Sequence, residues 1–304
     1  MTTAIATFGR VLTAMVTPFT PDGALDLDGA QKLAKWLTTE GGNDGLVIAG
    51  TTGESATLTH DEQIELISAC VEAIDGPVIA GAGSNDTRAA VELTERATAA
   101  GAAGLLLVAP YYNRPSQAGI ADHFRACAAA TEMPVLLYDI PVRTGRKVAT
   151  ETLIELCTEV DNIIGVKDAA GNPGETARLL SMAPPDTEIY SGDDGLTLPL
   201  LAVGAVGVIG VATHWAGNET AAMLDAFFAG DLAQARQINE AIIPSYAFET
   251  SDEAPNPIPT KAMMRVMGKP GGPTRPPMGP EPEWVEIEAK AVLAGLGRHL
   301  QVEG

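Results

Sequence analysis

Basic residues are scarce in this 304-residue chain. Its 19 Lys and Arg side chains stand against 39 Asp and Glu, so the formal net charge is −20. Nucleic acids and anionic membranes bind proteins through basic surfaces, and this balance therefore argues against both as partners. An anionic small molecule would have to be held by local cations or by backbone amides, because the overall field opposes it.

Cysteine is scarce as well. Cys70, Cys127 and Cys157 are odd in number and widely spaced within apolar helical patterns. Neither a disulfide framework nor a zinc site has such spacing, so we expect buried, reduced thiols. The first ten residues lack the cationic and apolar regions of a secretory signal. These features favour a cytoplasmic protein.

One long segment lacks charge altogether. Residues 195–218 contain no Asp, Glu, Lys or Arg and are numerous enough to span a bilayer. Pro199 and several glycines interrupt the segment, and they favour a short helix over residues 196–203 followed by a buried strand over 207–211. We therefore expect no membrane span.

Apolar runs of strand length alternate with amphipathic helical stretches along most of the chain. The expected strands are residues 11–16, 45–49, 78–80, 104–108, 135–138, 163–167, 188–191 and 207–211. Helices are expected over residues 28–39, 59–74, 87–100, 119–131 and 150–157. Such alternation predicts a parallel sheet, and eight units fit a closed (β/α)₈ TIM barrel. An open, doubly wound sheet is the alternative, but no glycine-rich dinucleotide loop follows the first strand.

The barrel is expected to occupy residues 1–217. Residues 218–304 are predicted to form a C-terminal helical region, with helices over 219–229, 232–249, 257–267 and 283–300. A loop rich in proline and glycine, residues 268–282, divides the last two helices.

Lys167 ends a β-branched apolar run that is typical of a buried strand. A buried lysine either pairs with a carboxylate or lowers its pKa, and a neutral amine is a nucleophile toward carbonyl carbon. Asp168 is poorly placed as a partner, because adjacent strand residues point to opposite faces. The other six lysines lie in polar helical or loop-like patterns, so Lys167, within an apolar strand, is predicted to be the only buried lysine. A snorkelling or ion-paired side chain is the alternative.

Other polar residues stand at the carboxyl ends of the strands, where a barrel places its active site. The glycines around Thr51 and Thr52 allow backbone N–H groups to form an anion-binding nest. Arg143 offers a planar fork for a second carboxylate. An amine, proton-transferring hydroxyls and two anion sites suit imine chemistry with two acidic substrates. No phosphate-loop, zinc or nucleophile-elbow spacing is present, so neither metal nor cofactor is expected.

Several polar and glycine-containing motifs follow one another in order along the chain: residues 50–55 (GTTGES), 110–113 (PYYN), 138–144 (YDIPVRT), 165–167 (GVK), 191–194 (SGDD) and 256–259 (NPIP). Together these motifs resemble the dihydrodipicolinate synthase family of pyruvate-dependent class I aldolases. The resemblance implies condensation of pyruvate with L-aspartate 4-semialdehyde to 4-hydroxy-tetrahydrodipicolinate, for lysine and diaminopimelate biosynthesis. The alternative within the superfamily is an aldolase acting on a sugar acid, either sialate lyase-like or a 2-keto-3-deoxy sugar acid aldolase. A non-catalytic barrel used for binding is a third reading.

The resemblance also implies roles for the motif residues. Lys167 would form the imine with pyruvate, with no other cofactor and no metal, and the loop of Thr51 and Thr52 would hold the pyruvate carboxylate. Tyr138 would pass protons through Thr51 and Tyr112.

The second substrate and the assembly follow from the same likeness. Arg143 would hold the semialdehyde carboxylate, while Gly192 and Ile209 would line the pocket through their backbone carbonyls. The family implies a homotetramer, a dimer of dimers, in which a tyrosine of the pair Tyr111 and Tyr112 enters the neighbouring subunit's site.

Family members that lysine inhibits commonly carry two histidines after the Thr-Thr-Gly loop and a glutamate in the next helix. This chain keeps Ser55, His60, Asn85 and Tyr111 but has Gln63 and Ala89 at the other two places. The missing carboxylate removes a charge-assisted hydrogen bond worth about 1.5 to 3 kcal/mol. Weak or absent lysine feedback is therefore expected.

Overall fold

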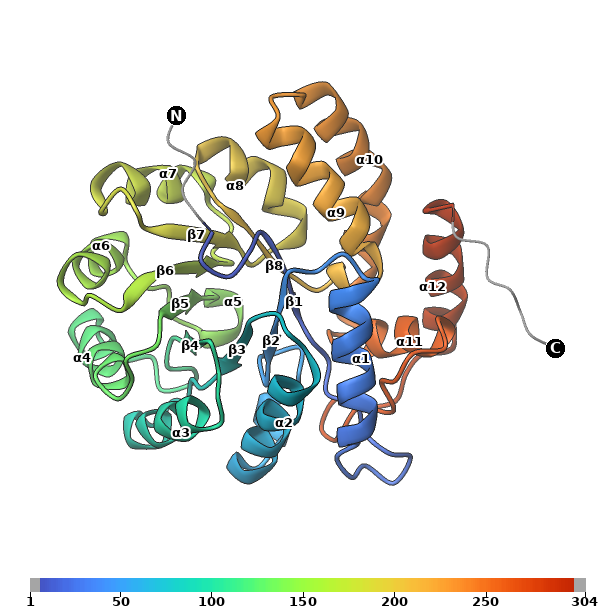
Figure 1. The fold of residues 1–304 in the computed structure, drawn as a ribbon, viewed down its shortest axis with the longest axis horizontal. Coiled ribbons are helices and arrows are strands. Elements are labelled where there is room, and N and C mark those ends of the chain that lie inside the picture. The colour runs from blue at the N-terminus through green and yellow to red at the C-terminus, as the bar shows by residue number, and fades with distance from the viewer. Residues whose placement is uncertain (1–5, 298–304) are drawn as a thin grey trace.

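The computed structural model describes residues 6–297. Its eight parallel strands form a closed barrel in chain order, and β8 pairs with β1 (Figure 1). The strands are β1 (Val11–Ala14), β2 (Gly45–Ile48), β3 (Val78–Gly81), β4 (Gly104–Val108), β5 (Val135–Asp139), β6 (Ile163–Asp168), β7 (Glu188–Ser191) and β8 (Gly207–Gly210). The predicted (β/α)₈ barrel is confirmed, and every expected strand is present.

A helix follows each strand and covers the outside of the barrel. These helices are α1 (Leu27–Thr39), α2 (His60–Ala73), α3 (Thr87–Ala99), α4 (Gln117–Ala128), α6 (Thr150–Glu159), α7 (Pro173–Met182), α8 (Thr197–Val203) and α9 (Thr213–Phe228). Thr59 and Glu62 begin α2 with a reciprocal capping box, and Asp86 caps α3 through the N–H of Arg88. Shorter helical turns, among them α5 (Pro141–Thr144) and the 3₁₀ turns η1 (Ser55–Thr57) and η2 (Asp194–Leu196), lie at the rim.

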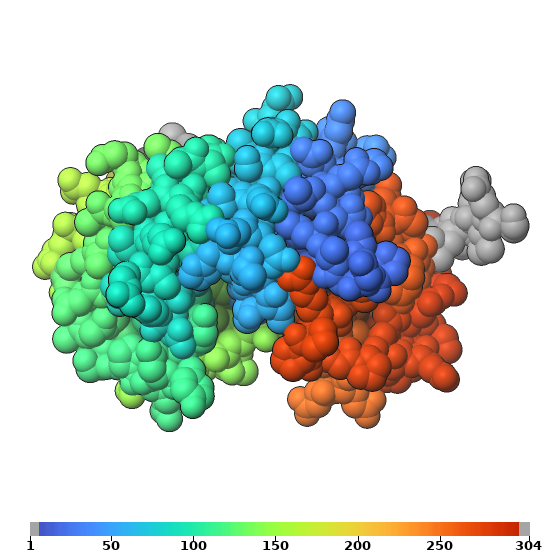
Figure 2. Space-filling view, turned by 90° about the horizontal axis from the view of Figure 1, so that it is seen from below, coloured from blue at the N-terminus to red at the C-terminus, as the bar shows by residue number. Residues whose placement is uncertain are grey.

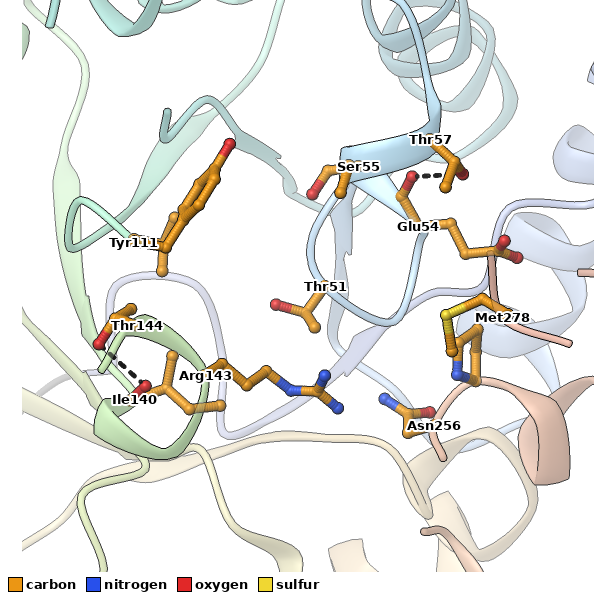
Figure 3. Close-up of a pocket in the computed structure, with 13 residues that line it drawn as sticks. Thr51, Glu54, Ser55, Thr57, Tyr111, Ile140, Arg143, Thr144, Asn256 and Met278 are labelled. Atoms are coloured by element: carbon orange, nitrogen blue, oxygen red, sulfur yellow. Dashed lines mark hydrogen bonds between the residues drawn. The ribbon is translucent and has the colours of Figure 1, made fainter. Parts of the chain in front are cut away.

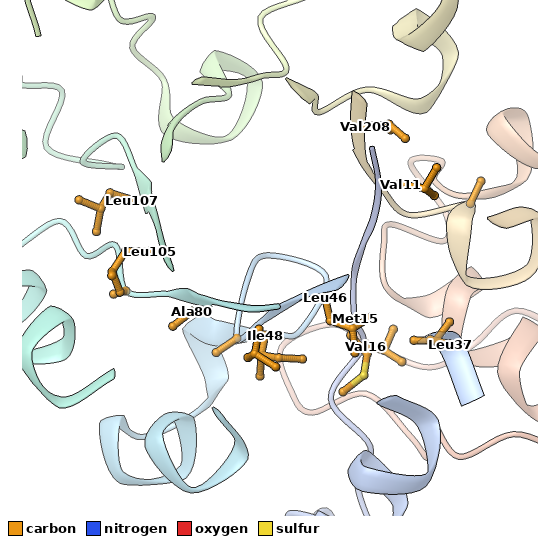
Figure 4. Packing of buried hydrophobic residues seen from close by; sticks show 14 of the residues in the cluster. Val11, Met15, Val16, Leu37, Leu46, Ile48, Ala80, Leu105, Leu107 and Val208 are labelled. Atoms are coloured by element: carbon orange, nitrogen blue, oxygen red, sulfur yellow. The ribbon is translucent and has the colours of Figure 1, made fainter. Parts of the chain in front are cut away.

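Strand side chains alternate between two apolar cores. Those that face outward pack beneath the helices, and Figure 4 labels Val11, Leu46, Ile48, Ala80, Leu105, Leu107 and Val208 among them. Those that face inward fill the barrel, including Leu12, Val47, Ile79, Leu106, Leu136, Tyr138, Tyr190 and Ile209. Tyr138, Lys167 and Tyr190 are register partners on β5, β6 and β7, so the lysine lies between two tyrosine positions.

The C-terminal region consists of α10 (Leu232–Phe248), α11 (Ile258–Val266) and α12 (Glu283–Gly295). Helix α9 packs against β1, β8 and α10, so it completes the ring of barrel helices. It begins earlier than the expected helix over 219–229, with a kink at Ala216, and the expected boundary between residues 217 and 218 lies inside it. The division into a barrel and a C-terminal region stays a prediction. Residues 298–300 of the last expected helix lie outside the described residues.

The uncharged segment divides into α8 and β8, as predicted. No helix in residues 6–297 is long and apolar enough to cross a membrane. Cys70, Cys127 and Cys157 are buried and form no disulfide.

Candidate active site

Lys167 lies inside the barrel near its carboxyl-terminal end, and its side chain is 4% exposed. Burial lowers its pKa to about 8, the charges of Asp194 and Glu249 partly oppose that shift, and Arg143 adds to it. None of the ion pairs among residues 6–297 includes Lys167. Asp168 points away and accepts hydrogen bonds from the Ala170 N–H and the Thr176 hydroxyl, as strand alternation predicts. The amine therefore keeps its donor and nucleophilic capacity.

Tyr138 lies beside this amine. The Lys167 Nζ is 4.4 Å from the centroid of the Tyr138 ring. Burial raises the pKa of Tyr138 to about 12, while Arg143 and a hydrogen bond with Thr51 lower it. The phenol is thus protonated at neutral pH and is linked to the threonine, which is the connection a proton relay requires.

Gly192 leaves room for the lysine side chain. A Cβ on this residue would lie 3.0 Å from both Cγ and Cε of Lys167, closer than unstrained packing allows. Ile209 on β8 is fully buried and faces the same interior. Gly192 therefore borders the Lys167 side chain, and the role of Ile209 in the pocket stays a prediction.

The loop after β2 takes a different backbone conformation from the one its glycines suggest. The left-handed φ values belong to Ala49 and Glu54, both at 56°, while Gly53 is required because a Cβ there would meet the Met15 carbonyl at 3.0 Å. None of the backbone hydrogen bonds recorded between described residues uses the N–H groups of Thr51 and Thr52. These two donors remain free for an anion.

The prediction that Lys167 is the only buried lysine is wrong, because Lys261 is buried as well. Its side chain is 2% exposed, and its Nζ lies 2.6 Å from Glu54 Oε1. Burial lowers its pKa to about 8, with Glu54 opposing the shift. The polar helical pattern around residue 261 failed to reveal this burial, because the partner carboxylate lies on a distant loop.

The C-terminal region completes the candidate site. The Asn256 side chain donates to the Thr52 hydroxyl at 2.9 Å. Arg275 donates its backbone N–H to Glu54 Oε2 and its guanidinium to the Thr57 carbonyl and to Glu62. Figure 2 shows the C-terminal part, in orange and red, packed against the blue segments that follow β1 and β2. Sequence reasoning gave none of these side chains a role.

A pocket of about 230 Å³ opens at this rim. It is lined by Thr51, Glu54, Ser55, Ala56, Thr57, Val108, Tyr111, Ile140, Arg143, Thr144, Asn256, Pro257 and Met278. Figure 3 shows Arg143 reaching from α5 across the pocket, with its guanidinium between Thr51 and Asn256. The pocket is therefore bordered by a cation and by hydroxyl and amide groups.

Tyr112 is the one predicted site residue that lies apart. Its side chain is 89% exposed and its φ is 71°, whereas the neighbouring Tyr111 lines the pocket of its own chain. Thr52 is buried, at 3% exposure, and its hydroxyl accepts from the Asn256 side chain. The structure thus brings together Lys167, Tyr138 and Thr51, with Arg143 across the pocket, and leaves Tyr112 outside.

Within residues 6–297, no group of three or more His, Cys, Asp and Glu side chains is arranged to hold a metal ion.

The structure also shows the contacts of Gln63, which stands where lysine-inhibited family members carry a different residue. Gln63 is buried, and its side chain donates to the Ser55 carbonyl at 2.9 Å.

A parallel eight-stranded barrel with a buried, low-pKa lysine beside a tyrosine–threonine pair has the architecture of a class I aldolase. The model of the Dihydrodipicolinate synthetase family matches residues 7–294, and the chain belongs to that family.

Individual relatives agree with this membership. The chain is 52% identical to a 4-hydroxy-tetrahydrodipicolinate synthase of Acidothermus cellulolyticus, over 91% of this chain and 90% of that protein. It is 50% identical to the Moorella thermoacetica protein of the same name, over 89% and 92%. Among solved structures, the lysine-bound enzyme from Cyanidioschyzon merolae is 42% identical, with a TM-score of 0.92 over 96% of this chain and 99% of that one.

Proposed function

We propose that this protein condenses pyruvate with L-aspartate 4-semialdehyde through a Schiff base on Lys167, giving 4-hydroxy-tetrahydrodipicolinate for lysine and diaminopimelate biosynthesis. The observation that carries the proposal is the buried Lys167 amine, with a pKa of about 8, beside the Tyr138–Thr51 hydrogen bond. Relatives at 50% and 52% identity bear the name of this synthase. The alternative, a sugar-acid aldolase, is not favoured by these relatives.

The residues divide the reaction between them. The neutral Lys167 amine adds to the pyruvate ketone and expels water, leaving a cationic iminium. Loss of a methyl proton gives the enamine, whose carbon attacks the semialdehyde aldehyde and forms the new carbon–carbon bond. The substrate amino group then attacks the imine carbon, closes the ring and releases Lys167. Tyr138 and Thr51 transfer protons to the pyruvate ketone oxygen, which leaves as water, and to the aldehyde oxygen, which becomes a hydroxyl group.

The carboxylates are held at separate places. The free N–H groups of Thr51 and Thr52 bind the pyruvate carboxylate, and Asn256 holds the Thr52 hydroxyl in place. Arg143 across the pocket binds the carboxylate of the semialdehyde. Gly192 and Ile209 border the imine. Neither a metal nor another cofactor takes part, since the imine itself is the electron sink.

We further propose a cytoplasmic homotetramer built as a dimer of dimers, in which Tyr112 completes the neighbouring subunit's relay. The exposed side chain of Tyr112 and its positive φ support this role. Two variants test it together: Lys167→Ala and Tyr112→Phe, each nearly inactive, should regain activity when unfolded and refolded as a mixture. A mixture as inactive as its components would contradict a tyrosine shared between subunits.

Borohydride trapping tests the chemistry. Protein treated with pyruvate and borohydride should gain the mass of a reduced pyruvate adduct, mapped by peptide mass spectrometry to Lys167. An adduct on another residue, or none, would reject the Schiff base. Turnover assays with aspartate semialdehyde and with a sugar aldehyde then separate the synthase from the alternative aldolase.

A further inference from the structure

Two carboxyl groups lie on one side of the Lys167 amine: Asp194 is buried, and Glu249 is a half-buried residue whose Oε2 atom is buried. Asp194 begins the η2 turn after β7 and is 3% exposed, while Glu249 follows the last turn of α10. The two side chains share a hydrogen bond, although 55 positions separate them in sequence. The reaction described above gives neither residue a task.

Their surroundings decide which of them holds the proton. Asp194 Oδ2 accepts the Val211 N–H at 2.8 Å and Oδ1 accepts the Ala212 N–H at 3.2 Å. Gly210 makes this approach possible, since a Cβ there would lie 2.5 Å from Asp194 Oδ1. Glu249 Oε2 is buried and accepts no hydrogen bond from a donor group of the described residues, and the Glu249 side chain shares only the Ala212 N–H with Asp194.

Two carboxyl groups in contact cannot both be ionised at neutral pH. Burial raises the pKa of both groups, and the charge of Asp194 raises that of Glu249 further. The backbone donors favour the charge on Asp194. Asp194 is therefore the carboxylate, and Glu249 is the acid that donates to it.

The pair lies on the lysine's side of the barrel. Gly192, two residues before Asp194, packs against the Lys167 side chain, and the negative charge of the pair favours the protonated form of the amine. Imine formation turns a neutral amine into a cation within an interior that also faces the positive Arg143. A cation there requires a nearby negative charge.

We propose that Asp194 and Glu249 are positioning residues that share one proton and hold one negative charge beside Lys167, where it stabilises the iminium. This inference rests on the proposed function. The other ionisable groups that face the pair or the amine are Asp193, Tyr246, Tyr138 and Arg143. Tyr246 stays neutral, because burial raises its pKa.

The direct test is a titration of Lys167 that needs no substrate. Limiting acetic anhydride, followed by peptide mass spectrometry, reports the fraction of neutral amine at each pH. Asp194→Asn should lower the midpoint by about one pH unit, the smallest shift typical of a lost opposite charge. The same variant should slow turnover by roughly tenfold or more, because the iminium loses its counter-charge.

Glu249 provides the conservative comparison. Glu249→Ala leaves Asp194 without its donor and should act in the same direction as Asp194→Asn, while Glu249→Gln restores a neutral donor and should recover most of the lost turnover. Glu240→Gln, an exposed position on the same helix, serves as the unchanged control. If circular dichroism shows that Asp194→Asn is unfolded, the turnover rates of the two Glu249 variants test the proposal instead.

A midpoint that stays at the wild-type value in Asp194→Asn, or equal losses in the alanine and glutamine variants of Glu249, would overturn the proposal. Its failure is distinct from failure of the proposed function. In the first case wild-type protein still traps pyruvate on Lys167, whereas in the second it does not.

Discussion

Two lysines are almost equally buried in this protein, and only one lies where it can do chemistry. Lys167 is 4% exposed and Lys261 is 2% exposed, and burial lowers the pKa of each to about 8. Lys261 forms an ion pair with Glu54 at 2.6 Å and donates to the Pro273 carbonyl at 2.7 Å. Lys167 has neither contact. The depth of burial therefore does not distinguish a nucleophilic lysine from a structural one. The distinguishing feature is an amine without an ion-pair or hydrogen-bond partner.

The two lysines also serve different parts of the molecule. Lys167 belongs to a strand and faces the barrel interior, where space beside Gly192 is kept open. Lys261 belongs to α11 and pairs with Glu54 in the loop that follows β2, and its amine also contacts the Phe19 ring and the Pro273 carbonyl. The Arg275 N–H binds the same glutamate. One amine reacts, and the other holds the loop that receives the substrate carboxylate.

Replacing the two lysines with methionine should separate chemistry from stability. Lys167→Met should lower turnover by a thousandfold or more, equivalent to roughly 4 kcal/mol of barrier, because no imine forms. Its free energy of unfolding should not fall, since an unpaired buried amine is replaced by an apolar chain of similar shape. Steady-state assays and urea titrations check both, with the exposed Lys35→Met as control. Turnover within tenfold of wild type would contradict the assignment.

Lys261→Met should show the opposite pattern. It leaves the Glu54 carboxylate buried without its cation, which should lower the free energy of unfolding by about 3 to 5 kcal/mol. Adding Glu54→Gln removes the stranded charge and should recover part of this loss, so a double-mutant cycle measures the coupling. If Lys261→Met is as stable as wild type, the ion pair has no structural role.

The pH dependence of Lys167 sharpens the comparison further. The neutral fraction of an amine increases with pH, so the rate of pyruvate adduct formation should rise through a midpoint near pH 8. Because the folded-state pKa lies below the reference value of 10.5, the unfolded chain binds more protons between these two values. Stability should therefore increase with pH across that window, and Lys167→Met should lack its share of the increase. A midpoint near pH 10 would mean an amine exposed to water.

Local patterns in the sequence were sufficient to predict the barrel and its lysine. Strand-length apolar runs are set by neighbouring residues, and the period of two correctly placed Asp168 on the opposite face from Lys167. The capping residues Thr59 and Asp86 likewise act within a few positions of themselves. Such features can be read along the chain because the interacting groups are close in sequence.

The contacts that complete the site could not be predicted in this way. Asn256 and Thr52 are 204 positions apart, and Arg275 and Glu54 are 221 positions apart. No periodicity relates such pairs. For the same reason the polar pattern around Lys261 does not reveal its ion pair with Glu54, a residue 207 positions earlier. The conformation of the Thr51 loop was also missed, because tertiary contacts impose left-handed φ values on Ala49 and Glu54 rather than on the adjacent glycines.

Arg275 offers a smaller test of the loop that Lys261 supports. Arg275→Ala removes the guanidinium contacts with the Thr57 carbonyl and Glu62, so the loop should bind pyruvate less well and KM for pyruvate should rise by about tenfold. The matched control is Arg265→Ala, which loses an ion pair with Glu281 and has no hydrogen bond or ion pair with residues 49–57 in the described part of the chain. Equal KM values in the two variants would show that the contact is structural only.

Lysine inhibition should show the smallest effect of all. A structure from Cyanidioschyzon merolae, 42% identical to this chain, has lysine bound. Here Gln63 turns its side chain to the Ser55 carbonyl, and Ala89 supplies no carboxylate for an ammonium group. Turnover should therefore be unchanged by lysine at sub-millimolar concentration, and Ala89→Glu should introduce measurable inhibition by adding a charge-assisted partner. Inhibition of the wild-type protein in that range would mean that other groups bind the effector's ammonium.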